Sequence, residues 1–168
     1  SLYPIENIEI IRQDSKTKLS AASVFQPALA YMVSEKNLMK EIQIKLTSEG
    51  IKSFPEPKKI ILDNSLDKVL IKLGKESITA SLLVACDGAN SKIKEHLNIR
   101  KKIKNFNQNA IVFNFETFKD VEKNAKQYFL EDSILALLPI SPRTISVVWS
   151  CNQNIFQRLS AINDSELI

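Results

Sequence analysis

The chain has 168 residues, of which 44% are hydrophobic and 25% charged, and its formal net charge is +4. A chain of this length and hydrophobic content can bury one sizeable core without disulfides, so we expect one domain or one large part of a domain. The three glycines lie too far apart for a Gly-x-Gly-x-x-Gly fingerprint or a phosphate loop. No apolar run reaches the roughly 20 residues of a membrane span, and no signal-peptide pattern opens the sequence.

The cysteines, the histidine and the basic run argue against several site types. Cys86 and Cys151 form no spaced pair, so we expect two reduced thiols in a cytoplasmic protein. His96 is the only histidine, which disfavours a metal site or a Ser-His-Asp triad within this chain. The basic run at residues 100–104 lacks the interleaved aromatic residues of a single-strand nucleic-acid platform, so we expect a solvated loop and no nucleic acid.

The first third of the chain predicts a hairpin and a helix. Residues 5–12 indicate a strand, residues 14–16 a polar turn, and residues 23–25 a return strand. Ser34 is a candidate N-cap for a helix through about residue 48, with Gly50 near its end. We expect one apolar face of this helix to pack, formed by Leu38, Met39, Ile42 and Leu46.

The middle of the chain predicts two strands and then a strand, turn and helix. Residues 59–63 and 68–73 are strand-like and are separated by a plausible turn at 64–67. Residues 81–86 form an apolar run that indicates a strand buried on both faces, within an α/β layer. Asp87 and Gly88 supply a turn, and Asn90 or Ser91 would cap the following helix, whose first turn could hold an anion or a ribose hydroxyl. A turn that only packs its helix on the sheet explains the same residues.

The last third predicts an antiparallel sheet followed by a helix. Strands are expected at residues 107–115, 134–138 and 144–149, with Pro139 ending the second strand and a turn at 141–143. A helix is expected from residue 154 past Leu159, and Asp164 is a candidate cap for another.

The stretch Leu-Leu-Val-Ala-Cys-Asp-Gly-Ala-Asn-Ser-Lys-Ile-Lys at residues 82–94 resembles the DG motif of the FAD-dependent aromatic hydroxylases. Lys94 stands where that family usually has Arg, so a bidentate phosphate contact would be lost. Three further stretches resemble the ubiquinone-biosynthesis branch, in type, order and approximate spacing: Leu-Ala-Tyr-Met-Val at 29–33, Leu-Ala-Leu-Leu-Pro-Ile at 135–140 and Ser-Val-Val-Trp at 146–149. Hydrophobic core explains each of these three equally well when taken alone.

This resemblance implies the roles of several residues. Asp87, Gly88, Ser91 and Lys94 would contact the FAD and NAD(P)H cofactors, with Ser91 also capping its helix. Leu138 and Pro139 would form part of the substrate pocket wall, although core packing explains them as well. The implied reaction is hydroxylation of a prenylated phenol, with FAD reduced by NAD(P)H and O₂ as the oxygen source. No catalytic residue and no metal ligand are implied, because the cofactor carries the chemistry.

The resemblance also implies an architecture of mixed α+β and α/β class. Residues 1–104 would belong to an FAD-binding domain containing the strand-turn-helix DG segment, and residues 105–168 to an antiparallel substrate-domain sheet. Because the family's other flavin-binding motifs do not occur, we expect a middle fragment of a larger two-domain flavoprotein that is itself inactive. Self-association of the fragment, and a peripheral membrane association of the parent, are further expectations.

Two alternatives stay open. One is a non-enzymatic α+β binding module, supported by the lack of a catalytic set in the sequence. The other is a related flavoprotein with different chemistry, such as a halogenase, an epoxidase or a prenyl reductase, that shares the DG motif.

Overall fold

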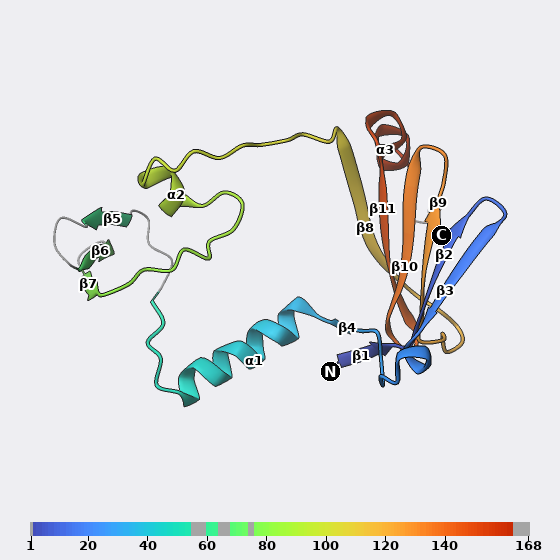
Figure 1. Ribbon diagram of the computed structural model, residues 1–168, viewed down its shortest axis with the longest axis horizontal. Coiled ribbons are helices and arrows are strands. Elements are labelled where there is room, and N and C mark those ends of the chain that lie inside the picture. The colour runs from blue at the N-terminus through green and yellow to red at the C-terminus, as the bar shows by residue number, and fades with distance from the viewer. Residues whose placement is uncertain (1, 55–59, 64–67, 74–75, 163–168) are drawn as a thin grey trace. The chain divides into compact units, whose positions relative to one another are not determined.

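The computed structural model describes residues 2–54, 60–63, 68–73 and 76–162, and it divides into two compact units (Figure 1). The first unit joins Ser1–Lys45 to Asn105–Ile168, and the second is Leu46–Lys104. The first 45 residues therefore cluster with the C-terminal sheet, whereas the sequence analysis grouped them with residues 46–104. Which unit serves flavin and which serves substrate stays a prediction.

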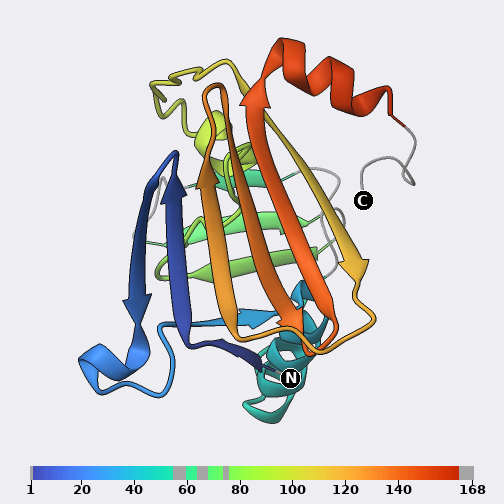
Figure 2. The same ribbon diagram turned by 90° about the vertical axis from the view of Figure 1, so that its right-hand side faces the viewer.

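A six-stranded sheet forms most of the first unit. Its strands lie side by side in the order β3-β2-β9-β10-β11-β8 (Figure 2). All neighbouring strands are antiparallel except β2 and β9, which pair in parallel. The bounds are β2 Asn7–Arg12, β3 Ser15–Ser20, β8 Gln108–Glu116, β9 Asn124–Phe129, β10 Ser133–Ser141 and β11 Thr144–Asn152. The predicted antiparallel sheet is thus confirmed, and the N-terminal hairpin extends it.

Side chains alternate across this sheet, because successive residues of a strand point to opposite faces. The register places one apolar set on a common face, here called the tryptophan face: Ile111, Phe113, Phe115, Leu135, Leu137, Ile145, Val147 and Trp149. Helix α3 (Gln153–Ser160) follows β11 directly and contacts β8 and β11. Asn152 caps this helix, since its Oδ1 accepts a hydrogen bond from the Ile155 amide at 3.0 Å. Cys151, Val147 and Leu159 are buried.

A small antiparallel sheet of β1 (Leu2–Ile5) and β4 (Ala30–Val33) lies against β10. Ile5 is fully buried there. The predicted return strand at 23–25 is wrong. The returning strand is β3, and Ala21–Val24 forms the single-turn 3₁₀ helix η1. Phe25 ends that turn with a φ of 54°, a conformation that stops an extended strand.

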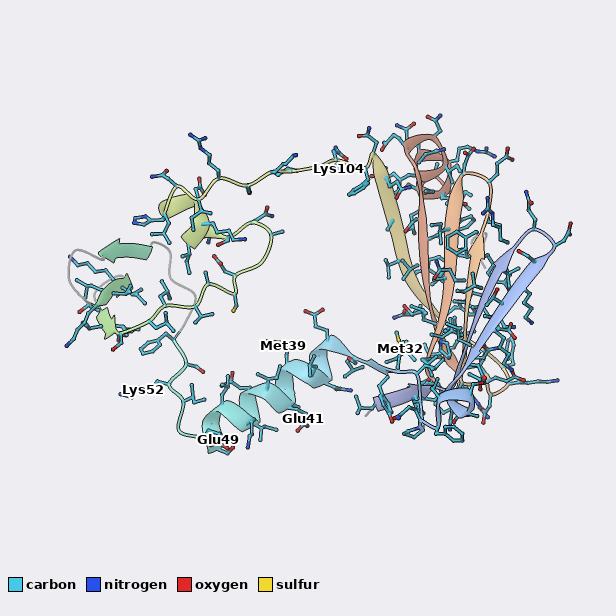
Figure 3. The ribbon with its side chains drawn as sticks, in the orientation of Figure 1. Met32, Met39, Glu41, Glu49, Lys52 and Lys104 are labelled. Atoms are coloured by element: carbon cyan, nitrogen blue, oxygen red, sulfur yellow. The ribbon has the colours of Figure 1, made fainter. Side chains whose placement is uncertain are left out.

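Helix α1 (Glu35–Ser48) confirms the predicted helix, and Gly50 follows it with a φ of +67°. None of its residues is buried, however, so the expected packed face is not seen in the described part of the chain. Figure 3 shows Met39 and Glu41 projecting from different sides of the helix, and Met39 is 58% exposed.

The second unit contains an antiparallel meander of β5 (Ile60–Asp63), β6 (Val69–Leu73) and β7 (Glu76–Ala80). The first two agree with the strands predicted at 59–63 and 68–73, whereas β7 ends before the strand predicted at 81–86. The predicted turn at 64–67 lies outside the described residues.

Two expectations about strands are wrong. Residues 82–86 form no strand, and Leu82 and Val84 are 75% and 67% exposed. A strand needs a neighbour to satisfy its backbone, and no described strand lies beside this run. Pro139 does not end β10, which continues to Ser141 across an irregular register between Pro139 and Ser141. The predicted cap Asp164 lies outside the described residues.

Candidate functional site

The DG segment begins two residues after β7 and continues into α2 (Lys92–His96). Its central feature is a chain of hydrogen bonds from Asp87 through Ser91 into the helix. The Ser91 hydroxyl donates to Asp87 Oδ1 at 2.6 Å and accepts from the Lys94 amide at 3.1 Å. The Ile93 amide donates to Asp87 Oδ2 at 3.3 Å. Ser91 is therefore the N-cap, as one of the two predicted candidates, and Asp87 acts as a second acceptor for the helix start.

This arrangement favours the ionised form of the Asp87 carboxyl. The Ser91 hydroxyl, and after it the Ile93 amide, hold the pKa of the Asp87 carboxyl below its ordinary value. Ser91 itself is only 6% exposed, whereas Asp87 is exposed. Because Asp87 is exposed, hydroxyl groups of a ligand can reach its carboxylate oxygens, in competition with the backbone amides that already donate to them.

Gly88 leaves the backbone open beside that carboxylate. Its φ is +81°, a conformation that L side chains rarely adopt, and an added Cβ would meet nothing within 4 Å. Glycine is therefore required here for the turn, and the space above it lets a ligand approach the main chain.

Lys94 lies one turn into α2, where its side chain is exposed. It lines a shallow depression of about 480 Å³ together with Asn90, Ser91 and Lys101. The two ammonium groups outnumber the single carboxylate, that of Glu95, at this depression and could attract a phosphate, although each acts as a point charge without the fork of Arg. The DG residues thus suit the hydroxyl and phosphate groups of a nucleotide cofactor.

The two predicted pocket residues, Leu138 and Pro139, lie on opposite faces of β10. The register pairs Leu138 with Ser146 and Pro139 with Ile145. Only Pro139 lines a depression of about 200 Å³ on the tryptophan face, with Leu137, Ile145 and Val121. The structure therefore separates the two residues, and it brings Pro139 together with side chains of β9 and β11.

A charged cluster beside that depression was missed by the sequence analysis. Glu9 on β2 is 7% exposed, and its Oε1 pairs with Lys16 Nζ at 2.9 Å. The hydrogen bond from Lys16 lowers the pKa of Glu9, and the Asn124 amide and the Lys126 charge act in the same direction. Asn124 and Lys126 belong to β9 and line the depression. The missing signal was the pairing of β2 with β9, because the segment around Lys126 was interpreted only as a polar stretch.

The two cysteines and the single histidine are the remaining candidate groups. Cys86 is exposed, not buried at a strand end as expected, and Cys151 is buried; both are free thiols. His96 is the last residue of α2. Across residues 2–54, 60–63, 68–73 and 76–162, no cluster of His, Cys, Asp or Glu could hold a metal ion. Within the same ranges, no helix is long and apolar enough to span a membrane.

Comparison with known proteins agrees with the resemblance that the sequence motifs indicate. No protein-family model matches the chain. The chain is 27% identical to a mitochondrial ubiquinone biosynthesis monooxygenase COQ6 from Caenorhabditis elegans, over 85% of this chain and 33% of that protein. It is 26% identical to the ubiquinone hydroxylase UbiL of Rhodospirillum rubrum, over 95% of this chain and 38% of that protein. The chain thus spans about a third of the length of these curated relatives.

The fold agrees with these sequence relatives. The crystal structure of pqsL, a probable FAD-dependent monooxygenase from Pseudomonas aeruginosa, matches with a TM-score of 0.74 and 16% identity. The match covers 92% of this chain and 44% of that one. The chain is therefore similar in sequence to ubiquinone-biosynthesis hydroxylases, and its mixed α+β fold matches that of FAD-dependent monooxygenases.

Proposed function

We propose that this chain forms part of an FAD-dependent monooxygenase that hydroxylates a phenolic ring, with NAD(P)H as reductant. The observation that carries the proposal is the similarity to named ubiquinone hydroxylases along most of the chain. The Asp87–Gly88 turn supports it, because a carboxylate acceptor and an open backbone lie side by side there. When bound, FAD would supply the redox chemistry that activates O₂.

The chain's own residues have binding and positioning roles in this proposal. Asp87 would accept hydrogen bonds from cofactor hydroxyl groups, while Gly88 allows the cofactor close to the main chain. Lys94 would attract a phosphate, and Ser91 would hold Asp87 ionised and oriented. The first unit would bind the substrate on the tryptophan face, where Pro139 is part of the pocket wall. Leu138, on the other face of β10, is a candidate only for a pocket on that opposite face.

The substrate class is proposed as a prenylated phenol. The support is the apolar set on the tryptophan face, because a prenyl chain gains about 25 cal/mol per Å² of apolar surface that it buries. The incomplete flavin site and the inactivity of this chain by itself belong to the same proposal. Cytoplasmic location, peripheral membrane association of the parent and self-association of the chain stay predictions.

The test is an FAD titration of this chain beside a longer protein that contains it and matches its relatives in length. We expect flavin fluorescence to be quenched, and NAD(P)H to be oxidised, only by the longer protein. Asp87→Asn in the longer protein should weaken FAD binding by about tenfold or more, since hydrogen bonds to charged groups contribute about 1.5–3 kcal/mol. The matched control is Asp120→Asn, an exposed Asp paired with Arg143 in the other unit.

Two results would count against the proposal. If the longer protein ignores flavin, the assignment is wrong and a non-enzymatic binding module becomes the better explanation. If it binds FAD but halogenates or epoxidises its substrate instead of hydroxylating a phenol, the chemistry belongs to the related flavoproteins.

A further inference from the structure

The depression beside Pro139 is lined by both apolar and charged side chains. Val121, Leu137, Pro139 and Ile145 make most of its wall apolar, and Glu122, Asn124 and Lys126 complete the lining. An aromatic ring can pack against these apolar side chains, because covering them deprives no polar group of the protein of a hydrogen-bond partner. The Lys126 ammonium would then favour rings that carry an anionic oxygen.

Lys126 is available for a ligand in a way that its neighbour Lys16 is not. Lys16 Nζ is engaged by the Glu9 carboxylate at 2.9 Å. In the described part of the chain, the Lys126 ammonium forms no hydrogen bond or ion pair, and it acts on Glu9 only through its field. Lys16 therefore forms the direct ion pair with Glu9, and Lys126 lines the depression without a direct ion pair among the described residues.

The other charged and titratable groups near Lys126 change the local charge at the depression but do not make it negative. Lys18 of β3 lies opposite Glu9 and adds positive charge, and Tyr128 follows on the same face of β9. Glu122 also lines the depression, but it is exposed, so water screens its negative charge more strongly than that of buried Glu9.

We propose that Lys126 binds an oxygen of the substrate ring, preferring the phenolate over the neutral phenol, while the apolar wall holds the ring. Glu9 is a positioning residue: from the adjacent strand, its carboxylate attracts the ammonium and keeps it at the edge of the pocket. This assignment rests on the proposed function for the identity of the substrate, and it adds the residue that recognises the ring oxygen.

The test uses 4-nitrophenol, whose absorbance reports directly whether it is ionised, titrated into the full chain in the absence of flavin. An opposite charge within about 4–6 Å typically lowers an acid's pKa by 1–3, and this pocket is partly open to water. We therefore expect the phenolate to bind about tenfold more tightly than the neutral form, seen as ionisation of the bound dye at lower pH.

Matched variants separate recognition from folding. Lys126→Met should abolish the preference for the phenolate, while Lys126→Arg should keep it. Lys18→Met is the control, because it removes a lysine from the same sheet face without touching the depression. 4-Nitroanisole, which has no ionisable oxygen, should bind Lys126→Met and the unmodified chain equally.

The outcomes distinguish this assignment from the proposed function. Loss of the preference in Lys126→Met alone supports it, even if the longer protein proves not to hydroxylate phenols. An equal preference in Lys126→Met and the unmodified chain overturns it, and so does the absence of any dye binding to a chain with native circular dichroism. A loss in Lys18→Met as large as in Lys126→Met also overturns it, because the effect would then be a general one of charge.

Discussion

The Ser91 hydroxyl is the link between the DG turn and α2, and Ser91→Ala should loosen the helix start. The hydroxyl accepts from the Lys94 amide and donates to Asp87, and both bonds disappear in Ser91→Ala. Loss of an N-cap costs about 1 kcal/mol, which corresponds to roughly a fivefold increase in the opening equilibrium. The freed Asp87 oxygen is exposed to water, so it adds little to this cost.

Hydrogen exchange measures this effect at the amide concerned. We expect the Lys94 amide to exchange about fivefold faster in Ser91→Ala, with Leu97 following because its amide bonds to Ile93 inside the same helix. Ser91→Thr keeps the hydroxyl and should exchange nearly as slowly as the unmodified chain, and amides of β11 should not change in either variant. Unchanged Lys94 exchange in Ser91→Ala, or equal acceleration in Ser91→Thr, would refute the capping argument.

Three further predictions follow from burial and charge. The pKa of Asp87 is depressed in the folded chain, so the contribution of Asp87 to stability is complete above its ordinary pKa and is lost as the pH falls through its pKa in the folded chain. NMR titration of the Asp87 carboxyl should show this depressed pKa, and Ser91→Ala should raise it. Cys86 should react at once with a thiol reagent in the native chain, whereas Cys151, buried and with a pKa raised by burial, should react only in denaturant. Rapid reaction of the one remaining thiol in native Cys86→Ser would contradict this. Leu159→Ala should lower the free energy of unfolding in urea by about 2–5 kcal/mol, against less than about 1 kcal/mol for Val112→Ala at a position 63% exposed, and similar losses for both would show that α3 does not cover the core.

Local chemistry was sufficient to predict the parts of the fold that depend on neighbours in sequence. The cap at Ser91, the glycine at 88 with its positive φ, helix α1 and the alternating strand β8 all follow from spacing and residue type. Each is determined within a few residues of chain.

The strand expected at 23–25 failed for a local reason, the left-handed conformation of Phe25, but most other failures involve partners distant in sequence. Residues 82–86 have strand composition, but composition cannot supply the neighbouring strand that the run needs. Pro139 was expected to end its strand, yet the ladder of β9 along β10 already stops at Leu137, so no hydrogen-bond donor is required on that side. The Glu9 and Lys126 cluster was hidden for the same reason, since only the β2–β9 pairing brings these two residues together.

The parallel pairing of β2 with β9 also sets the timing of folding during synthesis. Glu9 pairs with Lys126, so 117 residues separate the two partners. At about 5–20 residues per second, a ribosome needs roughly 6 to 23 seconds to make the second strand after the first has emerged. Throughout that interval the β2–β3 hairpin presents an unpaired edge, and Ile5 of β1 lacks the cover that β10 later gives to its strand. The nascent chain is therefore most vulnerable to aggregation before residue 129 emerges, and it is in this interval that a chaperone would have the greatest effect on yield.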